Sequence, residues 1–419
     1  MAEKGISMTE WLFVGNAFID EKIKKNIWLK IDNGKIGLIT QQNSEWTPQE
    51  DSILGKFPNG YLIPGLIDTH VHLVHTGSPT ESWEFDPVIV NPGFFSILAL
   101  HNAQKNIRHG VTTIRDLGSR DLADICVRDA ITQAQFVGSR IIAAGHPITT
   151  TAGHMDSSRY IRPGIPYESI AYMGIIADSP DEARRAVRRC LLEGSDVIKI
   201  NVSISEPVRP LHGLCAPEMT FDMMKAICDM AHQNMRKVTG HSHGGIAVDH
   251  AIAAGIDSLE HGRFLSEKQM EEMAKNGIYL TPTLSPDARP PLEERKQKPA
   301  DTEWTRKARN VMYETVKKAD SLGVKITAGS DAGMAYIEHG QIAYEIEELT
   351  KAGLSQQKAL LAATTYAAEN LGLSTITGSI KESLSADLIV VNKNPLDDVT
   401  VLKDEENFDL ILKEGQVVQ

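Results

Sequence analysis

The chain has 419 residues, of which 42% are hydrophobic and 23% are charged, so it can bury a sizeable core and extensive disorder is excluded. Its 43 Lys and Arg residues against 55 Asp and Glu residues give a net charge of −12. This balance excludes nucleic acid or an anionic membrane as the main partner and favours a small-molecule substrate. Because no apolar stretch reaches the roughly 18 to 20 residues of a membrane-spanning helix and no signal-peptide pattern is present, we expect a cytoplasmic protein.

Both ends of the chain carry the pattern of β-strands. Residues 11–39 alternate apolar and polar residues around an Asp-Asn-Gly turn signal, which predicts a β-hairpin or meander. Residues 386–391 and 409–418 have the same character. We therefore expect the two ends to pair into one small β-domain.

The central part of the chain repeats a short apolar run, a polar loop and an amphipathic segment. Residues 179–182 form a capping-box pattern with proline at the first helical position, and the helix that they begin ends at Gly194. The run that follows is rich in β-branched residues and is typical of a buried strand. Eight runs of this kind occur, mostly separated by helical segments that end in glycine. They are residues 66–72, 111–116, 140–146, 196–200, 237–241, 256–261, 278–283 and 325–331.

This alternation of strands and helices predicts parallel strands with crossover helices. Eight units favour an α/β fold of the (β/α)₈ TIM-barrel type. A doubly wound open sheet is the alternative, because the order of strands cannot be derived from the sequence. Residues 285–301 are rich in proline and charge and predict a long loop near the seventh strand.

Histidine and carboxylate side chains concentrate at the carboxyl ends of these runs, where barrel active sites lie. His70 and His72 end the first run, and their spacing of two places both imidazoles on the same side of a strand. Imidazole and carboxylate are both suitable ligands for Zn²⁺ and similar ions. The four cysteines contain no CxxC pair and do not indicate a thiolate zinc site. A single His-x-His pattern is a weak signal, so the argument depends on the combination. The candidates at one mouth are His70, His72, Lys199, His241, His261 and Asp331.

Lys199 needs a separate explanation, because an ammonium group cannot ligate a metal and is costly inside an apolar run. In the simpler interpretation it extends to solvent or pairs with Asp331. Alternatively, desolvation and nearby cations lower its pKa, and the neutral amine reacts with CO₂. The resulting carbamate would act as a carboxylate, and we hypothesise that it bridges two metal ions.

Several stretches together carry a resemblance that covers the whole chain: PGLIDTHVHL, HGVTTIRDLGS, VIKI, HSHG, SLEHG, AGSDAG, TYAAENLGL and SADLIVVNKNPLDDV. The sequence resembles the amidohydrolase superfamily, and within it the imidazolonepropionase-like branch of metal-dependent dipeptidases and carboxypeptidases that includes Xaa-Pro dipeptidases. The resemblance implies a β-sandwich of residues 1–62 and 373–419 beside a barrel of residues 63–372, and a homo-oligomer.

The same resemblance assigns roles to the candidate residues. It implies that His70, His72 and Asp331 bind the more buried metal, that His241 and His261 bind the second, and that carboxylated Lys199 bridges them. Zn²⁺ is the first expectation for both ions, with Mn²⁺, Co²⁺ and Fe²⁺ also compatible.

Two positions refine the comparison within the superfamily. Mononuclear deaminases carry His-x-x-Glu at the fifth strand, but Gly244 stands three residues after His241 here, which favours the binuclear hydrolytic branch. The glycine-rich loop that usually follows the bridging lysine is replaced by residues 201–206. We expect this loop to touch the substrate, and the replacement leaves the specificity open.

The expected reaction is hydrolysis of an amide, with a dipeptide or an N-acyl amino acid as first choice and cyclic amides, carbamates or esters behind it. A hydroxide that bridges two divalent ions is available near neutral pH, because metal binding lowers the pKa of water from about 15.7 to about 7. Asp331 would take its proton and deliver it to the leaving amine. His154 and His243 are candidates for stabilising the oxyanion or holding a substrate carboxylate, and the alternative for each is an ordinary loop histidine.

Two other classes of function remain as alternatives. Residues 240–244, Gly-His-Ser-His-Gly, match the nucleophile elbow of serine hydrolases, with Ser242 as the nucleophile. That interpretation leaves His70, His72 and Lys199 without a role. A non-catalytic protein that binds a small molecule is the third class, because a fold does not guarantee activity.

Overall fold

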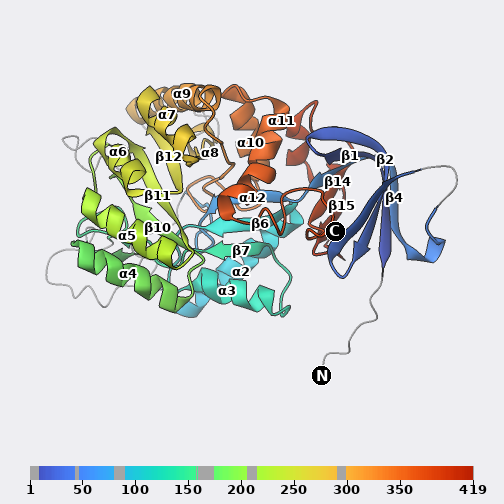
Figure 1. Ribbon diagram of the computed structural model, residues 1–419, viewed down its shortest axis with the longest axis horizontal. Coiled ribbons are helices and arrows are strands. Elements are labelled where there is room, and N and C mark those ends of the chain that lie inside the picture. The colour runs from blue at the N-terminus through green and yellow to red at the C-terminus, as the bar shows by residue number, and fades with distance from the viewer. Residues whose placement is uncertain are drawn as a thin grey trace.

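The computed structural model describes residues 9–42, 47–79, 90–156, 158, 174–204, 215–289 and 299–418. Figure 1 shows a barrel surrounded by helices and, beside it, a sheet in which blue strands from the N-terminal end lie next to red strands from the C-terminal end. The predicted α/β fold, a TIM-type barrel with a β-sandwich built from both ends, is therefore confirmed.

The barrel wall is parallel and closes on itself. Within its two sheets, β5 to β7 pair in parallel, and so do β8 and β10 to β13. Between the sheets, the Asp196 N–H donates to the Ala143 carbonyl at 2.8 Å, and residues 325–332 bond to β13 on one side and β5 on the other. A doubly wound open sheet is thus wrong. The strands are β5 (Leu66–Val71), β6 (Val111–Asp116), β7 (Arg140–Ala143), β8 (Ile148–Thr149), β9 (Ile175–Ile176), β10 (Val197–Asn201), β11 (Lys237–Gly244), β12 (Ser258–Phe264) and β13 (Tyr279–Thr281).

Two wall segments are less regular than the sequence predicts. The third run was expected to continue to His146, but β7 ends at Ala143, before Gly145 at φ +64° and Pro147, and the wall resumes in β8. Proline lacks the N–H that a continuous ladder needs. The eighth run, residues 325–331, forms single bridges instead of a strand, because its backbone hydrogen bonds are divided between two neighbours.

The helices begin and end largely where the sequence signals predict. Helix α4 starts after Ser179, whose hydroxyl accepts from the Glu182 N–H at 3.3 Å, and stops at Gly194 with φ +98°. The predicted capping box is only half formed, because the Glu182 carboxylate accepts from the Asp178 N–H instead of the Ser179 N–H. The helices are α2 (Pro92–Arg108), α3 (Ala123–Thr132), α4 (Pro180–Glu193), α5 (Phe221–Gln233), α6 (Gly245–Ala254), α7 (Glu267–Asn276), α8 (Ser285–Ala288), α9 (Pro299–Ser321), α10 (Ile342–Lys351), α11 (Gln356–Ala362) and α12 (Thr365–Leu371).

The long loop predicted for residues 285–301 is wrong at both ends. Residues 285–288 form α8, and Pro299 begins α9, while residues 290–298 lie outside the described part of the chain. Proline is compatible with the first turn of a helix, where its missing N–H has no partner to lose. Among the helices that the structure describes, none is both long and apolar enough to cross a bilayer.

The seven-stranded sheet has its own core, separate from that of the barrel. Its order is β16-β15-β14-β4-β1-β2-β3, so the two ends of the chain meet where β14 pairs antiparallel with β4. Leu12, Leu29, Leu62, Val390 and Leu412, each 0% exposed, belong to one cluster inside it. The strands are β1 (Glu10–Ile19), β2 (Lys22–Asp32), β3 (Lys35–Gln41), β4 (Ile53–Pro64), β14 (Leu388–Val391), β15 (Phe408–Lys413) and β16 (Gln416–Val417). The predicted N-terminal meander is confirmed.

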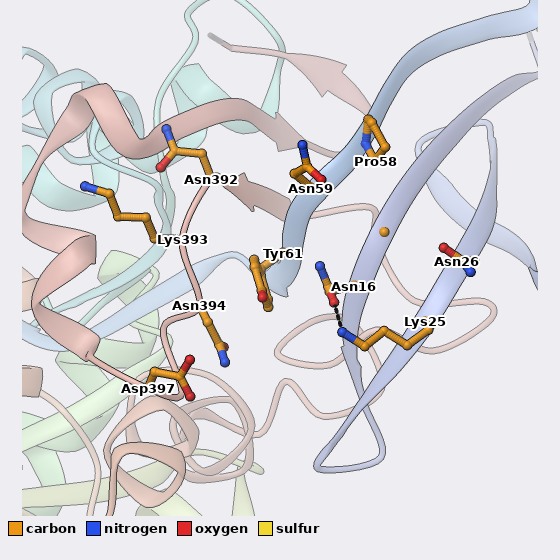
Figure 2. Close-up of a pocket in the computed structure, with 11 residues that line it drawn as sticks. Asn16, Lys25, Asn26, Pro58, Asn59, Tyr61, Asn392, Lys393, Asn394 and Asp397 are labelled. Atoms are coloured by element: carbon orange, nitrogen blue, oxygen red, sulfur yellow. Dashed lines mark hydrogen bonds between the residues drawn. The ribbon is translucent and has the colours of Figure 1, made fainter.

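Strand β4 bulges where it passes β1, with residues 58–60 facing the single residue Gly15. A Cβ atom on Gly15 would lie 1.8 Å from the carbonyl oxygen of Pro58, so only glycine fits. The Asn16 side chain donates to the Gly60 carbonyl at 3.1 Å and fixes the bulge. A hollow of about 590 Å³ lies beside it. Figure 2 shows its lining residues, which include Lys25, Asn59, Tyr61, Asn392 and Asp397.

A buried ion pair joins the sheet to the barrel. Arg140 on β7 donates to the carboxylate of Asp387 at 2.6 Å, and the Asp387 side chain is 0% exposed. Burial alone would raise the pKa of Asp387, but Arg140 and hydrogen bonds to the carboxylate outweigh burial and hold that pKa below its ordinary value. The pair therefore stabilises the fold when Asp387 is ionised.

Arg140→Ala tests this junction, because it leaves a buried carboxylate without its counter-charge. We expect a loss of about 3 kcal/mol in the free energy of unfolding at pH 7. Since the pKa of Asp387 is depressed in the folded protein, the stabilisation is present above the unfolded pKa and is lost as the pH falls through the folded pKa. The difference in the free energy of unfolding between the native protein and the variant should therefore narrow below about pH 4. Urea unfolding at several pH values measures it. Arg184→Ala, which removes an exposed pair with Asp181, should have a far smaller effect, and equal losses in both variants would contradict the account.

Candidate metal centre

Three of the predicted ligands converge at the mouth of the barrel. His70 lies in β5, His72 directly follows it, and Asp331 ends the eighth wall segment. The Nε2 atoms of both histidines lie 3.5 Å from Oδ1 of Asp331. Ligand atoms of the three residues lie within 4.8 Å of one another, and all three side chains are buried. This is the arrangement that a single divalent cation requires.

Two further histidines extend this trio into one continuous cluster. The ring of His261 lies 5.2 Å from that of His70 and 4.5 Å from that of His241, measured between centroids. His241 lies on β11 at the end of its pairing with β10, the strand that carries Lys199. The structure thus brings together the residues that the sequence places at the ends of strands five and six.

The backbone at His261 and Asp331 departs from regular strand geometry. His261 has φ +68° and Asp331 has φ +58°, in the left-handed region that residues other than glycine rarely occupy. In β12, Glu260 pairs with His241, so regular alternation would point the next side chain away from the interior. The left-handed residue turns the His261 imidazole back into the mouth, as strained residues often do at functional sites.

Hydrogen bonds fix the orientation of the imidazoles. Nδ1 of His70 contacts the Glu260 carboxylate at 2.7 Å, Nδ1 of His72 donates to the Gly118 carbonyl at 3.2 Å, and Nδ1 of His261 contacts the Thr283 hydroxyl at 2.6 Å. Each Nε2 is thereby left for the centre. Nε2 of His241 is buried and has no hydrogen-bond partner in the described structure. A buried nitrogen without a partner is costly, and a metal ion would satisfy it.

The charge states suit cation binding as well. Burial, helped by the neighbouring histidines and Lys199, lowers the pKa of His72, His241 and His261 well below the ordinary value. Neutral imidazole is the form that ligates metals. Lys199 is 2% exposed, and burial lowers its pKa to about 8 against the opposing effect of Glu260 and Asp331. The donor set therefore fits divalent ions.

The two predicted substrate-binding histidines also lie at this mouth. His154 stacks on His241 with 4.5 Å between ring centroids, and the backbone N–H of His154 donates to the Glu218 carboxylate at 2.8 Å. The ring of His243 lies 4.9 Å from that of His241. Burial lowers the pKa of His243 to about 3, so it is neutral. Both can offer a hydrogen bond to a ligand at the centre.

Known proteins with this fold support the same interpretation. Residues 61–418 match the amidohydrolase family. The chain belongs to the amidohydrolase family. It is 27% identical to ochratoxinase of Aspergillus niger over 383 residues, which cover 85% of this chain and 75% of that protein. It is also 28% identical to an uncharacterized protein of Mycobacterium tuberculosis over 369 residues, which cover 86% of each chain.

Solved structures extend the likeness over nearly the whole chain. A Xaa-Pro dipeptidase with bound methionine in its active site superposes with a TM-score of 0.86 and 29% identity, covering 98% of this chain and 100% of that one. A prolidase complexed with N-methylphosphonate-L-proline superposes with a TM-score of 0.84 and 25% identity, and the match covers 98% of this chain and 99% of that one. With the buried trio of His70, His72 and Asp331, these likenesses identify a metal-dependent hydrolase that acts on C–N bonds.

The amidohydrolase fold shows why Ser242 is an unsuitable nucleophile. Its side chain is 0% exposed, and its hydroxyl donates to the Glu260 carbonyl at 3.2 Å. It lies within β11 and pairs with His261 across the ladder, whereas a nucleophile elbow presents its serine on a sharp turn. The match at residues 240–244 is therefore a coincidence of sequence.

Glu260, a buried carboxylate that is not among the residues predicted from the sequence, supports the candidate ligands. Glu260 is 0% exposed and accepts hydrogen bonds from Arg115 and His70, both at 2.7 Å, and from the Thr239 hydroxyl. Burial alone would raise the pKa of Glu260, but the Arg115 guanidinium and His70 outweigh it and lower that pKa to about 2. Alternation along the predicted strand places Glu260 on the same face as Ser258, and a carboxylate on the inward face of a barrel strand is the signal that could have identified it.

A second missed carboxylate joins the two segments that carry the trio. Asp68 accepts from the backbone N–H of Ser330 at 2.9 Å and from that of His70 at 3.2 Å. Burial raises the pKa of Asp68 to about 7, although these hydrogen bonds oppose the shift. Asp68 thereby fixes the separation between β5 and the segment that ends at Asp331.

Glu260→Gln tests the support of His70, because it keeps the shape of the side chain and removes the charge that faces Arg115. We expect metal affinity to fall about 10- to 100-fold, measured by competition with a chromogenic chelator. Glu267→Gln, which alters an exposed carboxylate paired with Lys318, should leave the affinity unchanged. Equal affinity in Glu260→Gln and the native protein would show that Glu260 does not orient the ligand.

Proposed function

We propose that this amidohydrolase is a binuclear metal-dependent hydrolase that cleaves the amide bond of a dipeptide or an N-acyl amino acid. The observation that carries the proposal is one buried cluster whose free Nε2 atoms and carboxylate face a common centre. The bound methionine of the similar Xaa-Pro dipeptidase and the proline phosphonate of the similar prolidase support a substrate with an amino-acid part.

The residues would divide between two divalent ions. His70, His72 and Asp331 would hold one, and His241 and His261 would hold the second; Zn²⁺ suits a donor set dominated by imidazole. When bound, the ions lower the pKa of water to about 7 and polarise a carbonyl. The depressed pKa values of His72, His241 and His261 keep these rings neutral and ready to ligate.

Asp331 carries the proton in this mechanism. Its carboxylate lies 3.5 Å from the Nε2 atoms of both His70 and His72, so it borders the place where water and substrate meet. It takes a proton from the attacking water as the oxygen bonds to the substrate carbonyl carbon, and it delivers that proton to the amine nitrogen as the C–N bond breaks. Its left-handed backbone holds the carboxylate in this position.

Lys199 would complete the centre as a carbamate formed with CO₂. The reaction requires the neutral amine, and the pKa of about 8 that burial imposes makes that form accessible near neutral pH. As a carboxylate between the two groups of candidate ligands, the modified side chain would offset part of the positive charge that bound divalent ions would bring. The buried position of Lys199, 2% exposed, protects it from bulk water.

His154 and His243 would bind the substrate at the rim of the centre. Both rings lie within 5 Å of the His241 ring, at 4.5 and 4.9 Å. A neutral imidazole N–H can stabilise the oxyanion or hold a carboxylate of the substrate. Cyclic amides, carbamates and esters would use the same groups and are the alternative substrates.

A substrate library with and without chelation tests the proposed function. We expect the metal-loaded protein to hydrolyse members of a dipeptide and N-acyl amino acid library, to lose this activity on chelation and to regain it with Zn²⁺, because bound ions supply both water activation and carbonyl polarisation. Asp331→Asn should reduce kcat by at least about 100-fold, since it cannot accept the proton.

The control is Asp229→Asn, which changes an exposed carboxylate on α5 paired with Lys225 and should leave kcat unchanged. Hydrolysis that survives chelation and is abolished by a serine-directed phosphonate would instead support Ser242 and overturn the proposal.

A further inference from the structure

Asn201 is a buried amide beside the metal centre to which no role has yet been given. It is the last residue of β10, two positions after Lys199, so both side chains share the inward face of the strand. Across the ladder it pairs with His241. Its exposed fraction is 0%. Asn201 therefore lies next to ligands of both proposed ions, on the side nearer the mouth.

Within the described part of the chain, neither polar atom of the Asn201 side chain has a hydrogen-bond partner: both Nδ2 and Oδ1 are buried and unsatisfied. Among the other buried asparagines that the structure describes in the barrel, each has at least one bonded side-chain atom, although Oδ1 of Asn370 is also unsatisfied. Asn102 donates to the Leu73 carbonyl at 2.9 Å, and Asn106 accepts from the Gly340 N–H at 2.8 Å. A fully buried amide with two unused atoms is costly and rare in folded proteins. Such a cost is expected where a residue is kept for a ligand.

The two unused atoms define the chemistry of that ligand. Oδ1 can only accept a hydrogen bond, and Nδ2 can only donate. A carboxylate would use Nδ2 alone, and an ammonium group would use Oδ1 alone. The N–H and C=O of a trans secondary amide point to opposite sides, so one carboxamide cannot pair with both groups of the same amide. The amino acid on the nitrogen side of the scissile bond, when extended, presents the amide N–H and an oxygen of its carboxylate on the same side, and so satisfies both atoms.

We infer that Asn201 recognises the scissile amide group of the substrate, with Oδ1 accepting its N–H and Nδ2 donating to a substrate oxygen. This inference rests on the proposed function and narrows the substrate class to secondary amides. The amide nitrogen of a Xaa-Pro bond carries no hydrogen, and an ester has oxygen in that place. Either substrate leaves Oδ1 of Asn201 buried without a donor, so this enzyme discriminates against the bond for which its Xaa-Pro dipeptidase relatives are named.

Three matched substrates test the inference: an N-acyl-alanine, its N-methylated tertiary amide and the corresponding ester of lactic acid. The metal-loaded native protein should show a kcat/KM for the secondary amide at least about tenfold above that for the tertiary amide. In Asn201→Leu, of similar volume, kcat/KM for the secondary amide should fall at least about tenfold, while the tertiary amide and the ester change little. Asn201→Ala provides a second variant with the same expected loss of preference.

Thermal unfolding gives an independent readout. Replacing an unsatisfied buried amide by leucine should keep or raise the unfolding midpoint, because apolar groups of the same shape avoid the desolvation cost. Asn276→Ala, on α7, alters an amide away from the mouth and should change neither preference nor midpoint.

The outcomes separate the two claims. The inference about Asn201 is overturned, and the proposed function left intact, if both Asn201 variants keep the native preference for the secondary over the tertiary amide. The same holds if the native protein prefers the tertiary amide. A lowered midpoint with unchanged preference gives Asn201 a structural role and also overturns it. A native protein that hydrolyses none of the three substrates overturns the proposed function, and the inference with it.

Discussion

The carboxylate of Glu260 is the interaction on which the rest of the centre depends. It receives the Arg115 guanidinium from β6, the His70 ring from β5 and the Thr239 hydroxyl from β11, while itself lying on β12. A carboxylate and a guanidinium can both be 2% exposed or less only because each neutralises the other. The pair therefore fixes the relative positions of four barrel strands, β5, β6, β11 and β12, beside the candidate ligands.

The candidate ligands lie above this ion pair, and two of them are placed by local departures from regular strand geometry. Alternation along β5 places His70 and His72 correctly, but His261 and Asp331 reach the centre only through left-handed backbone. Asp68 holds the segment of Asp331 against β5 through the N–H of Ser330. Because these positions are strained or desolvated, the centre is costly to the apoprotein, and bound cations would recover part of that cost.

The sequence was sufficient for the fold and for the ligand candidates, because both depend on periodic patterns. Short apolar runs that end in histidine or aspartate predicted the barrel walls and the location of His70, His72, His241, His261 and Asp331. The turn of His261 into the mouth, the break of the third wall at Ala143 and the irregular eighth wall were not predictable, since they arise from contacts between segments far apart in the chain. Alternation along β12 could place Glu260 on the inward face of its strand, but its pairing with Arg115 on β6 depends on such distant contacts.

The central claim is that six side chains form a centre for two metal ions, with carboxylated Lys199 between them. The most direct test is the metal content per chain, measured by plasma mass spectrometry on the native protein and on Lys199→Ala after equilibration with Zn²⁺. We expect about two equivalents in the native protein and at most about one in the variant, because the remaining ligands lose their bridging group. One equivalent in the native protein, or two in Lys199→Ala, would contradict the account.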